Sequence, residues 1–267
     1  MSTILDIDDY ELGEARDIVT AFGTERFGYV VTPNVDHVIR HYYDPAFRAL
    51  YAQAAYVFLD SHFLAHVVGL LKRRRHRVSP GSDLTATMLS SVIKPNDAVV
   101  MVGGSAAQAQ ELRERFGLKA LRFIDPPMNF IHDPAAVESC LRQIEESSPF
   151  RFCFLAIGCP QQEIIAQKLK QRGVARGLAL CIGASINFIT GVEKRAPLWL
   201  RNSGFEWLYR LVRNPRRLAK RYLVRGPRIF LLLPYIELRL RRPVTVPRAV
   251  ITMSGAPVIT AVTSSQS

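Results

Sequence analysis

The sequence lacks any long apolar stretch. None reaches the roughly 18–20 residues that a helix needs to cross a bilayer, and the longest candidate, Ile229–Ile236, is interrupted by Pro234. The N-terminus has neither a basic region nor an apolar core of the kind that secretory signals carry, so we expect no such signal. These absences argue against an integral membrane protein and favour a cytoplasmic location.

Cysteine pairs and histidine clusters with metal-ligand spacing are also missing. The four cysteines show no CxxC spacing and lie in apolar or helix-like runs, which is typical of reduced thiols in the cytosol. His62 and His66 are four residues apart, but no second group of ligands accompanies them. Asp6-Ile7-Asp8 has the DxD form that holds a divalent metal on nucleotide sugars, yet it precedes any strand end that we predict, so we interpret it as incidental. We expect neither metal nor cofactor.

Acidic residues are scarce in the last part of the chain. Residues 194–267 hold fifteen Lys and Arg but only two acidic residues, Glu206 and Glu237, whereas residues 1–193 hold twenty Lys and Arg against twenty-one Asp and Glu. The net charge of +12 therefore comes from the C-terminal segment. A nearly neutral body with a basic segment indicates an anionic partner, which is a membrane surface, a phosphorylated lipid or a nucleic acid.

Short β-rich runs alternate with helix-like stretches through about residue 193. Several of the runs are almost wholly apolar, as parallel strands covered on both faces are. This rhythm predicts an α/β fold, a Rossmann-like sandwich with a mainly parallel sheet. The expected strands are Tyr29–Val31, Tyr56–Leu59, Ala98–Val102, Leu121–Ile124, Phe152–Ile157 and Leu178–Ile182, and the expected helices include Ala106–Phe116, Pro134–Glu146 and Gln162–Arg172.

Prolines at 197, 215, 227 and 234 divide the C-terminal segment into short helices. From Gly204 onward, apolar and basic residues recur on two faces at helical spacing. A solvated surface helix is one interpretation; the many arginines, with tryptophan and tyrosine among them, favour contact with an anionic interface. We divide the chain into a catalytic domain (1–193), a basic amphipathic appendage (194–242) and a disordered tail (243–267). We expect a chain shortened to about residue 195 to fold as a soluble, inactive core.

Polar residues follow several predicted strands, at the sheet edge where α/β proteins bind ligands. Asp60 can accept a proton from an attacking hydroxyl or cap the helix that follows, and the pattern does not separate these interpretations. Thr32-Pro33-Asn34 offers a hydroxyl and an amide that suit hydrogen bonds to a sugar, although such residues are also common in turns.

Two glycine turns also follow strands. Gly103-Gly104-Ser105 can hold phosphate on backbone N–H groups; with Asp125 about twenty residues later it also permits a dinucleotide site, although GGSAAQ departs from GxGxxG. The second turn, Gly158 to Glu163, places an amide and a carboxylate at a helix start, where they can bind a base or ribose or simply cap the helix.

Taken together, these motifs resemble the WecG/TagA/CpsF glycosyltransferases (glycosyltransferase family 26) over about residues 4–225. The matching elements are Thr32-Pro33-Asn34, Asp60, Arg77-Val78-Ser79-Pro80-Gly81-Ser82-Asp83, Asp125-Pro126-Pro127-Met128, Gly158-Cys159-Pro160-Gln161-Gln162-Glu163, Arg195-Ala196-Pro197, Glu206-Trp207-Leu208-Tyr209-Arg210-Leu211, Pro215-Arg216-Arg217 and Arg221-Tyr222. The sequence departs from the family pattern at Ser61-His62, where a glycine usually follows the aspartate, and at the extra Pro80.

The resemblance implies an inverting transferase of surface or exopolysaccharide biosynthesis. It would move a hexose or N-acetylhexosamine from a UDP-sugar to a polyprenyl-diphosphate-linked sugar at the inner face of the plasma membrane. Arginines rather than a metal would balance the diphosphate, and the sugar, the acceptor and the oligomeric state, a homo-oligomer included, stay open. The implied catalytic residues are Asp60, Thr32 and Asn34, and the implied binding residues are Arg77, Asp83, Gly103, Gly104, Gly158, Pro160, Gln162, Glu163, Arg195, Arg210, Arg217 and Arg221.

Two other classes of function remain as alternatives. A nucleic-acid-binding protein would use the basic segment with aromatic stacking platforms and would not need Asp60. A nicotinamide-dependent oxidoreductase would use Gly103-Gly104 and Asp125. We prefer the transferase, with an anionic membrane and no nucleic acid as its macromolecular partner, because the basic segment continues into the apolar residues Ile229–Leu233, which suit lipid.

Overall fold

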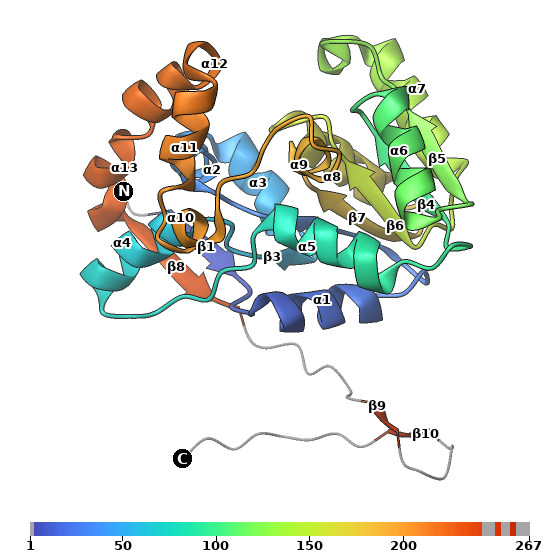
Figure 1. Ribbon diagram of the computed structural model, residues 1–267, viewed down its shortest axis with the longest axis horizontal. Coiled ribbons are helices and arrows are strands. Elements are labelled where there is room, and N and C mark those ends of the chain that lie inside the picture. Colours follow the sequence, from blue (N-terminus) through green and yellow to red (C-terminus); the bar gives the residue numbers. More distant parts are fainter. Residues whose placement is uncertain (1–2, 242–248, 252–256, 260–267) are drawn as a thin grey trace.

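A computed structural model describes residues 3–241, 249–251 and 257–259 of the chain. Its centre is a six-stranded sheet in the order β3-β2-β7-β6-β4-β5, in which every neighbouring pair is parallel (Figure 1). The strands are β2 (Phe27–Val31), β3 (Tyr56–Val57), β4 (Val99–Val102), β5 (Leu121–Ile124), β6 (Phe152–Leu155) and β7 (Gly177–Cys181). The prediction of a mainly parallel sheet is confirmed.

Helices cover both faces of this sheet, so each apolar strand is buried on two sides. One face packs against α2 (Val35–Tyr43), α3 (Pro45–Ala52), α4 (His62–Lys72), α7 (Pro134–Glu145) and α8 (Gln161–Arg172). The other packs against α1 (Leu12–Ala21), α5 (Gly81–Thr87), which continues into a π-helical turn (Met88–Val92), α6 (Ala106–Phe116) and α9 (Ser185–Ile189). The chain is therefore a Rossmann-like α/β sandwich, as the alternating pattern predicted.

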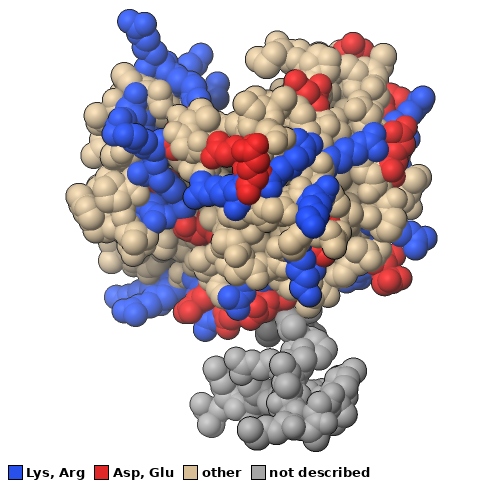
Figure 2. Space-filling view, turned by 45° about the vertical axis from the view of Figure 1, so that its right-hand side comes forward, with Lys and Arg blue, Asp and Glu red and all other residues tan. Residues whose placement is uncertain are grey.

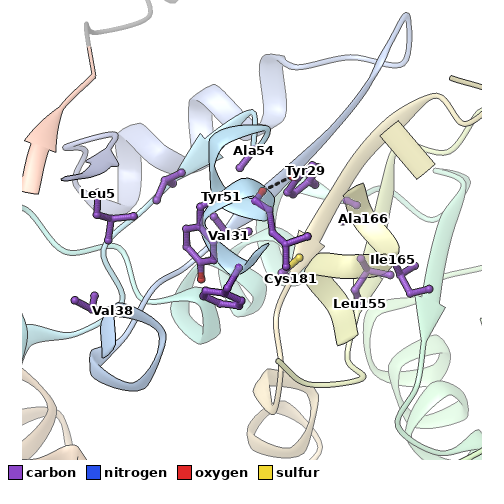
Figure 3. Packing of buried hydrophobic residues seen from close by; sticks show 14 of the residues in the cluster. Leu5, Tyr29, Val31, Val38, Tyr51, Ala54, Leu155, Ile165, Ala166 and Cys181 are labelled. Carbon is purple, nitrogen blue, oxygen red and sulfur yellow. Dashed lines mark hydrogen bonds between the residues drawn. The ribbon is translucent and has the colours of Figure 1, made fainter. Parts of the chain in front are cut away.

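Successive residues of a strand contribute their side chains to different halves of the core, one on each face of the sheet. Val31 and Leu155 belong to one cluster of buried side chains, and the preceding Val30 and Phe154 belong to the other, because successive side chains of a strand point to opposite faces. Figure 3 shows the first cluster, where the hydroxyl of Tyr29 donates to the backbone carbonyl of Leu50. This bond ties α3 to the second strand and satisfies a buried polar group.

The predicted strands and helices agree closely with the structure, and the differences lie at their ends. The strand expected to reach Leu59 ends at Val57, and the strand expected to reach Ile157 ends at Leu155. One strand was missed: β1 (Thr3–Ile7) contains Asp6, and Asp8 follows it directly. The expectation that Asp6-Ile7-Asp8 precedes any strand end is therefore wrong, because the motif lies at the end of β1.

The C-terminal segment is a chain of short helices whose starts follow the prolines. They are α10 (Leu198–Asn202), α11 (Glu206–Arg213), α12 (Pro215–Ala219), a π-helical turn (Lys220–Arg225), α13 (Arg228–Leu232) and a 3-10 turn (Leu233–Tyr235). Pro197 and Pro227 stand directly before α10 and α13, and Pro215 is the first residue of α12, where a missing N–H costs nothing. The prediction of proline-divided short helices is confirmed.

The end of this segment completes the core of the body. β8 (Ile236–Leu240) pairs in parallel with β1, with Ile236 opposite Thr3 and Leu240 opposite Ile7. Ile229, Leu232, Leu233, Ile236 and Leu238 are buried in the same cluster as Leu5 and Ile7. This arrangement argues against the expectation that a chain ending near residue 195 folds as an independent core.

The predicted disordered tail lies largely outside the described residues. Its two described pieces, β9 (Ala249–Ile251) and β10 (Pro257–Ile259), pair antiparallel. Within the part of the chain that the structure covers, no helix combines the length and the apolar character that crossing a bilayer requires.

Candidate active site

A cavity of about 460 Å³ lies at the carboxyl ends of β2, β3, β6 and β7. The residues after these strands form its floor, and the C-terminal helices α10 to α13 form the opposite wall. Floor residues include Thr32, Asn34, Asp60, Gly81, Gly158, Cys159, Gln162 and Gly183, and wall residues include Arg201, Glu206, Trp207, Arg210, Arg217, Arg221, Tyr222 and Phe230. The basic segment thus covers the sheet edge at which polar residues were predicted to converge.

Asp60 lies on the cavity floor with an unusual ionisation. Its Oδ1 accepts the backbone N–H of Gly81 at 2.8 Å. Burial raises the pKa of Asp60 to about 6, an effect that Glu206 adds to and that the Gly81 N–H and the guanidinium groups of Arg210 and Arg195 oppose. A carboxylate of this pKa can hold and release a proton near neutral pH, as a general base must.

The alternative role of Asp60 as a helix cap is wrong. Ser61 caps α4 instead, since its Oγ accepts the N–H of Leu64 at 3.2 Å. The Ser61 that departs from the family pattern therefore has a structural task, and the Asp60 carboxylate does not cap α4.

Thr32 and Asn34 lie beside Asp60 on the loop after β2. Gly81 is so close to Thr32 that a Cβ on Gly81 would come within 2.6 Å of the threonine Oγ1. Asn34 caps α2 by accepting the N–H groups of Asp36 and His37, and the same oxygen accepts Nη2 of Arg221 at 3.2 Å. The structure thus brings all three predicted catalytic residues together, with Asn34 also fixing an arginine of the wall.

Three predicted arginines, Arg210, Arg217 and Arg221, line the cavity. Glu193 holds two of them: its carboxylate lies 2.9 Å from Nη2 of Arg217 and 3.9 Å from Nη2 of Arg210. Asp36 also lies 3.9 Å from Nε of Arg221, and Glu206 lines the same wall. Carboxylates thus hold guanidinium groups that are concentrated on one wall, and such groups suit an anionic ligand.

Arg195 and Asp83 form a second cluster next to the cavity. Both terminal nitrogens of Arg195 donate to the Asp83 carboxylate, and Arg201 donates to the same carboxylate at 3.0 Å. These guanidinium groups hold the pKa of Asp83 below its usual value although burial raises it. Asp83 therefore acts as an anchor for the C-terminal helices, and neither Asp83 nor Arg195 lines the cavity.

Gln162 and Glu163 are buried at the start of α8. Oε1 of Gln162 accepts the N–H of Gly183 at 2.9 Å, and its amide donates to Glu163 at 2.9 Å. Burial raises the pKa of Glu163 to about 7. Gln162 and Gly158 reach the cavity, whereas Pro160 and Glu163 lie behind its surface.

The spacing of His37, Cys159 and Glu163 would suit an ion, because their ligand atoms lie within 4.8 Å of one another. His37 Nδ1 is already 3.1 Å from the hydroxyl of Tyr51, and burial lowers the pKa of His37 to about 4. Burial also raises the pKa of the Cys159 thiol. Burial thus favours the neutral forms of His37 and Cys159, and the three side chains together support the cavity floor.

The structure does not bring Arg77, Gly103 or Gly104 to the cavity. Arg77 pairs with Glu14 at 2.7 Å on the surface. Gly103 and Gly104 have φ values of +82° and +86° and form a tight turn after β4, where side chains would collide with Ile157 and Met101. The turn therefore serves packing, and the phosphate interpretation of Gly103-Gly104 has no support in this geometry.

The sequence analysis did not name Glu206 or the aromatic residues of the wall as site residues, nor Glu193, which pairs with two arginines of the wall. Phe63 contacts Trp207 and Phe230, with ring centroids 6.5 and 6.1 Å apart, and Trp207 contacts Tyr222. A signal existed for Glu206, since it is one of two acidic residues in the last 74. No signal distinguished Glu193 from the many surface carboxylates.

An α/β fold whose parallel strands end at an arginine-walled cavity with a high-pKa carboxylate is typical of an enzyme that transfers groups from phosphorylated substrates. The family model of the Glycosyl transferase WecG/TagA/CpsF family matches residues 3–243, and the chain belongs to this family. Membership implies glycosyltransferase activity in the biosynthesis of cell-surface polysaccharide. It argues against both the oxidoreductase and the nucleic-acid-binding alternatives.

Proposed function

We propose that the protein is an inverting transferase that moves a hexose or N-acetylhexosamine from a UDP-sugar to a polyprenyl-diphosphate-linked sugar. The observation that carries this proposal is the position of Asp60, whose pKa is raised to about 6, opposite a wall that contains Arg210, Arg217 and Arg221. A base and a set of cations face each other across one cavity, which is what a displacement with an anionic leaving group requires.

The reaction is a single displacement at the anomeric carbon of the donor. The acceptor hydroxyl oxygen forms a bond to that carbon on one face, while the bond to the UDP oxygen breaks on the other. Asp60 accepts the hydroxyl proton as the oxygen attacks. The electron pair of the broken bond goes to UDP, whose diphosphate gains negative charge. Inversion follows from attack opposite the leaving group.

The arginines of the wall supply the charge that stabilises the leaving diphosphate. Guanidinium groups form paired hydrogen bonds to phosphate oxygens, and those of Arg201, Arg210, Arg217 and Arg221 reach the cavity. Asn34 and Glu193 hold three of these side chains in place before the substrate arrives, so little reorganisation is needed in the transition state. We therefore propose metal-independent catalysis.

The lipid-linked acceptor requires the enzyme to work at a membrane surface. The C-terminal helices expose several large apolar side chains among their arginines, which are Leu198, Trp199, Phe205, Leu208, Val212, Leu223, Val224, Phe230 and Leu231. Such a surface suits the interface of an anionic bilayer. We propose peripheral attachment to the inner face of the plasma membrane through residues 194–242.

The test is a radiolabelled transfer assay with purified full-length protein, a panel of UDP-sugars and polyprenyl-diphosphate-sugar acceptors, each with and without EDTA. Incorporation from one donor, unchanged by EDTA, is the expected result and would name the sugar. Incorporation that EDTA abolishes would contradict the arginine mechanism. Folded protein that transfers from no donor to any acceptor would contradict the proposed reaction.

A further inference from the structure

Outside the C-terminal segment, the tip of α4 combines exposed leucines with unpaired cations. Leu70 and Leu71 are 83% and 57% exposed, and Lys72-Arg73-Arg74-Arg75 follows them directly. None of these four basic side chains makes a hydrogen bond or ion pair with another described residue. Elsewhere in the body, arginines such as Arg151 and Arg172 pair with carboxylates. Among the described residues, the basic side chains of the α4 tip, residues 70–75, thus have no hydrogen-bond or ion-pair partner.

Local backbone geometry keeps the basic residues beside the leucines. Arg73 ends the helix with φ of +51°, which turns the chain back toward the last helical turn. At Gly69 a Cβ would come within 3.1 Å of the carbonyl oxygen of Arg74, so the absence of a side chain there permits the close return. The helix macrodipole accounts for a cation at Lys72, but it accounts neither for Arg74 and Arg75 nor for two exposed leucines.

The α4 tip lies on the same side of the molecule as the C-terminal helices. Phe63 at the start of α4 contacts Trp207 of α11 and Phe230 of α13, and Figure 1 shows α4 extending from beside α10 to the edge below α13. Figure 2 shows Lys and Arg side chains gathered along that side. The apolar and basic surface of the C-terminal helices therefore continues onto an element of the catalytic domain.

We propose that the α4 tip is a second lipid contact, in which Leu70 and Leu71 enter the interface of an anionic bilayer while Lys72–Arg75 bind its phosphates. Exposed leucines next to unpaired cations match the two components of such an interface. A nucleic acid would use the cations but give the leucines no partner. The inference rests on the proposed function in one respect, namely that the acceptor is held in a membrane.

This contact limits the distance from the bilayer to the base. α4 starts two residues after Asp60 and runs for 11 residues, which is about 16 Å at the usual rise per residue. With its tip in the interface, the start of α4 beside Asp60 lies at most about one helix length from the lipid, so an acceptor diphosphate-sugar can extend from the surface to the base. Two contacts, the C-terminal helices and the α4 tip, also restrict how the enzyme tilts.

The experiment measures sedimentation of the full-length protein with vesicles of phosphatidylcholine alone or with anionic phosphatidylglycerol. The variant Leu70→Glu/Leu71→Glu should lower binding to anionic vesicles at least about tenfold, because it removes apolar insertion and adds repulsion. Its control is Val174→Glu, a residue as exposed as Leu71 at 57%, on the turn between α8 and β7. That control should bind like the unmodified protein.

The charges are tested by Arg74→Glu/Arg75→Glu against Lys94→Glu/Lys119→Glu, which changes two exposed lysines of the body by the same charge. Each basic residue near an anionic surface strengthens binding about fivefold, so the arginine variant should bind anionic vesicles at least about 25-fold more weakly. Unchanged vesicle binding in the leucine variant would overturn the proposal. The proposal would also be overturned if Arg74→Glu/Arg75→Glu lost binding to RNA but bound vesicles like the unmodified protein.

Activity assays separate this inference from the proposed function. With a short-chain, water-soluble acceptor the α4-tip variants should turn over like the unmodified protein, whereas with the acceptor in vesicles their rates should fall with their binding. Vesicle binding of the predicted kind without transfer from any UDP-sugar would defeat the proposed reaction and leave the lipid contact standing. Transfer that is equal in all variants on vesicle-embedded acceptor would defeat the lipid contact alone.

Discussion

Arg195 donates both of its terminal nitrogens to the carboxylate of Asp83, a residue 112 positions earlier in the chain. The pair joins the start of the C-terminal segment to α5 of the catalytic domain, and Arg201 adds a further bond to the same carboxylate. The helices that form the arginine wall are therefore held over the cavity by a carboxylate that is itself outside it.

Replacing Asp83 with Asn should loosen this attachment. Arg195 and Arg201 would lose their counter-charge in a largely enclosed position, and we expect a loss of roughly 2 kcal/mol in the free energy of unfolding. Limited proteolysis should then cut faster near residues 194–204. The matched control is Asp97→Asn, which breaks a similar pair with Arg151 at 2.9 Å away from the C-terminal helices. Equal protease sensitivity in the two variants would contradict the anchoring role.

The Asp83 attachment should also weaken in acid. Its pKa is lowered in the folded protein, so the pair stabilises the fold above the usual pKa of an aspartate, near 4, and this contribution is lost as the pH falls through the lowered value. Proteolysis with an acid protease between pH 5 and pH 2 should show the segment near residues 194–204 becoming accessible in the unmodified protein. Asp83→Asn should show no such additional change.

Asp60→Asn should abolish transfer while preserving UDP binding. The amide oxygen can still accept the Gly81 N–H, but the side chain can no longer take a proton, so kcat should fall by about 10²–10⁴-fold. In the unmodified enzyme the rate should rise with pH up to about 6, the pKa of Asp60, and then level off. Turnover close to normal in the variant, measured with saturating donor, would remove Asp60 from the mechanism.

The same substitution should make the protein more stable. Because the pKa of Asp60 is raised from 3.8 to about 6, its ionised form costs stability above pH 6, and this cost disappears as the pH falls toward 4. Asparagine cannot ionise, so we expect a gain on the order of 2 kcal/mol at pH 8 and almost none at pH 4. Denaturant unfolding at the two pH values measures the difference, and an equal effect at both would show that the carboxylate is not destabilised.

Gly81→Ala tests the close approach that positions the base. The new Cβ would lie 2.6 Å from Oγ1 of Thr32, so the loop must move and the 2.8 Å bond from the Gly81 N–H to Asp60 must lengthen. We expect kcat to fall at least about tenfold, and the acid limb of the pH profile to move to higher pH because a bond that favours the carboxylate is weakened. Gly13→Ala, where a Cβ meets nothing within 4 Å, should leave both unchanged.

Two adjacent arginines offer a sharp test of the wall. Both side chains are exposed, but Arg217 lines the cavity and pairs with Glu193, whereas Arg216 does not line it. Arg217→Ala should lower kcat/KM about 100-fold through loss of a cation at the leaving diphosphate. Arg216→Ala should stay within about twofold, as surface substitutions usually do. Equal losses would mean that charge density, and not position, is what the segment contributes.

The sequence predicted the central sheet well because local pattern determines it. β4, Val99–Val102, is wholly apolar and lies between clear turns, and Asp60 was placed correctly because a carboxylate after a buried parallel strand has one edge at which to lie. The basic wall was predicted as a region, but charge alone could not show that Arg217 lines the cavity and Arg216 does not.

What the sequence did not predict depends on distant partners. β1 alternates buried and exposed residues over only five positions, and its partner β8 follows more than 200 residues later. Arg77 was expected at the substrate because it stands within a family-like motif, yet its side chain turns to Glu14. Neither the pairing of β1 with β8 nor the contact of Arg77 with Glu14 can be predicted from neighbouring residues in the chain. Each depends on packing between distant segments of the fold.

The pairing of β1 with β8 determines when the enzyme can become active. Asp6 and Arg239, which hydrogen-bond across this pair, are 233 residues apart, and closing so large a loop is entropically costly and slow relative to local helix formation. A chain still being made cannot bury Leu5 and Ile7 against their final neighbours or place the arginine wall over Asp60. The chain must therefore be synthesised through β8 before the cavity is complete and before the C-terminal helices can make the lipid contact proposed for them.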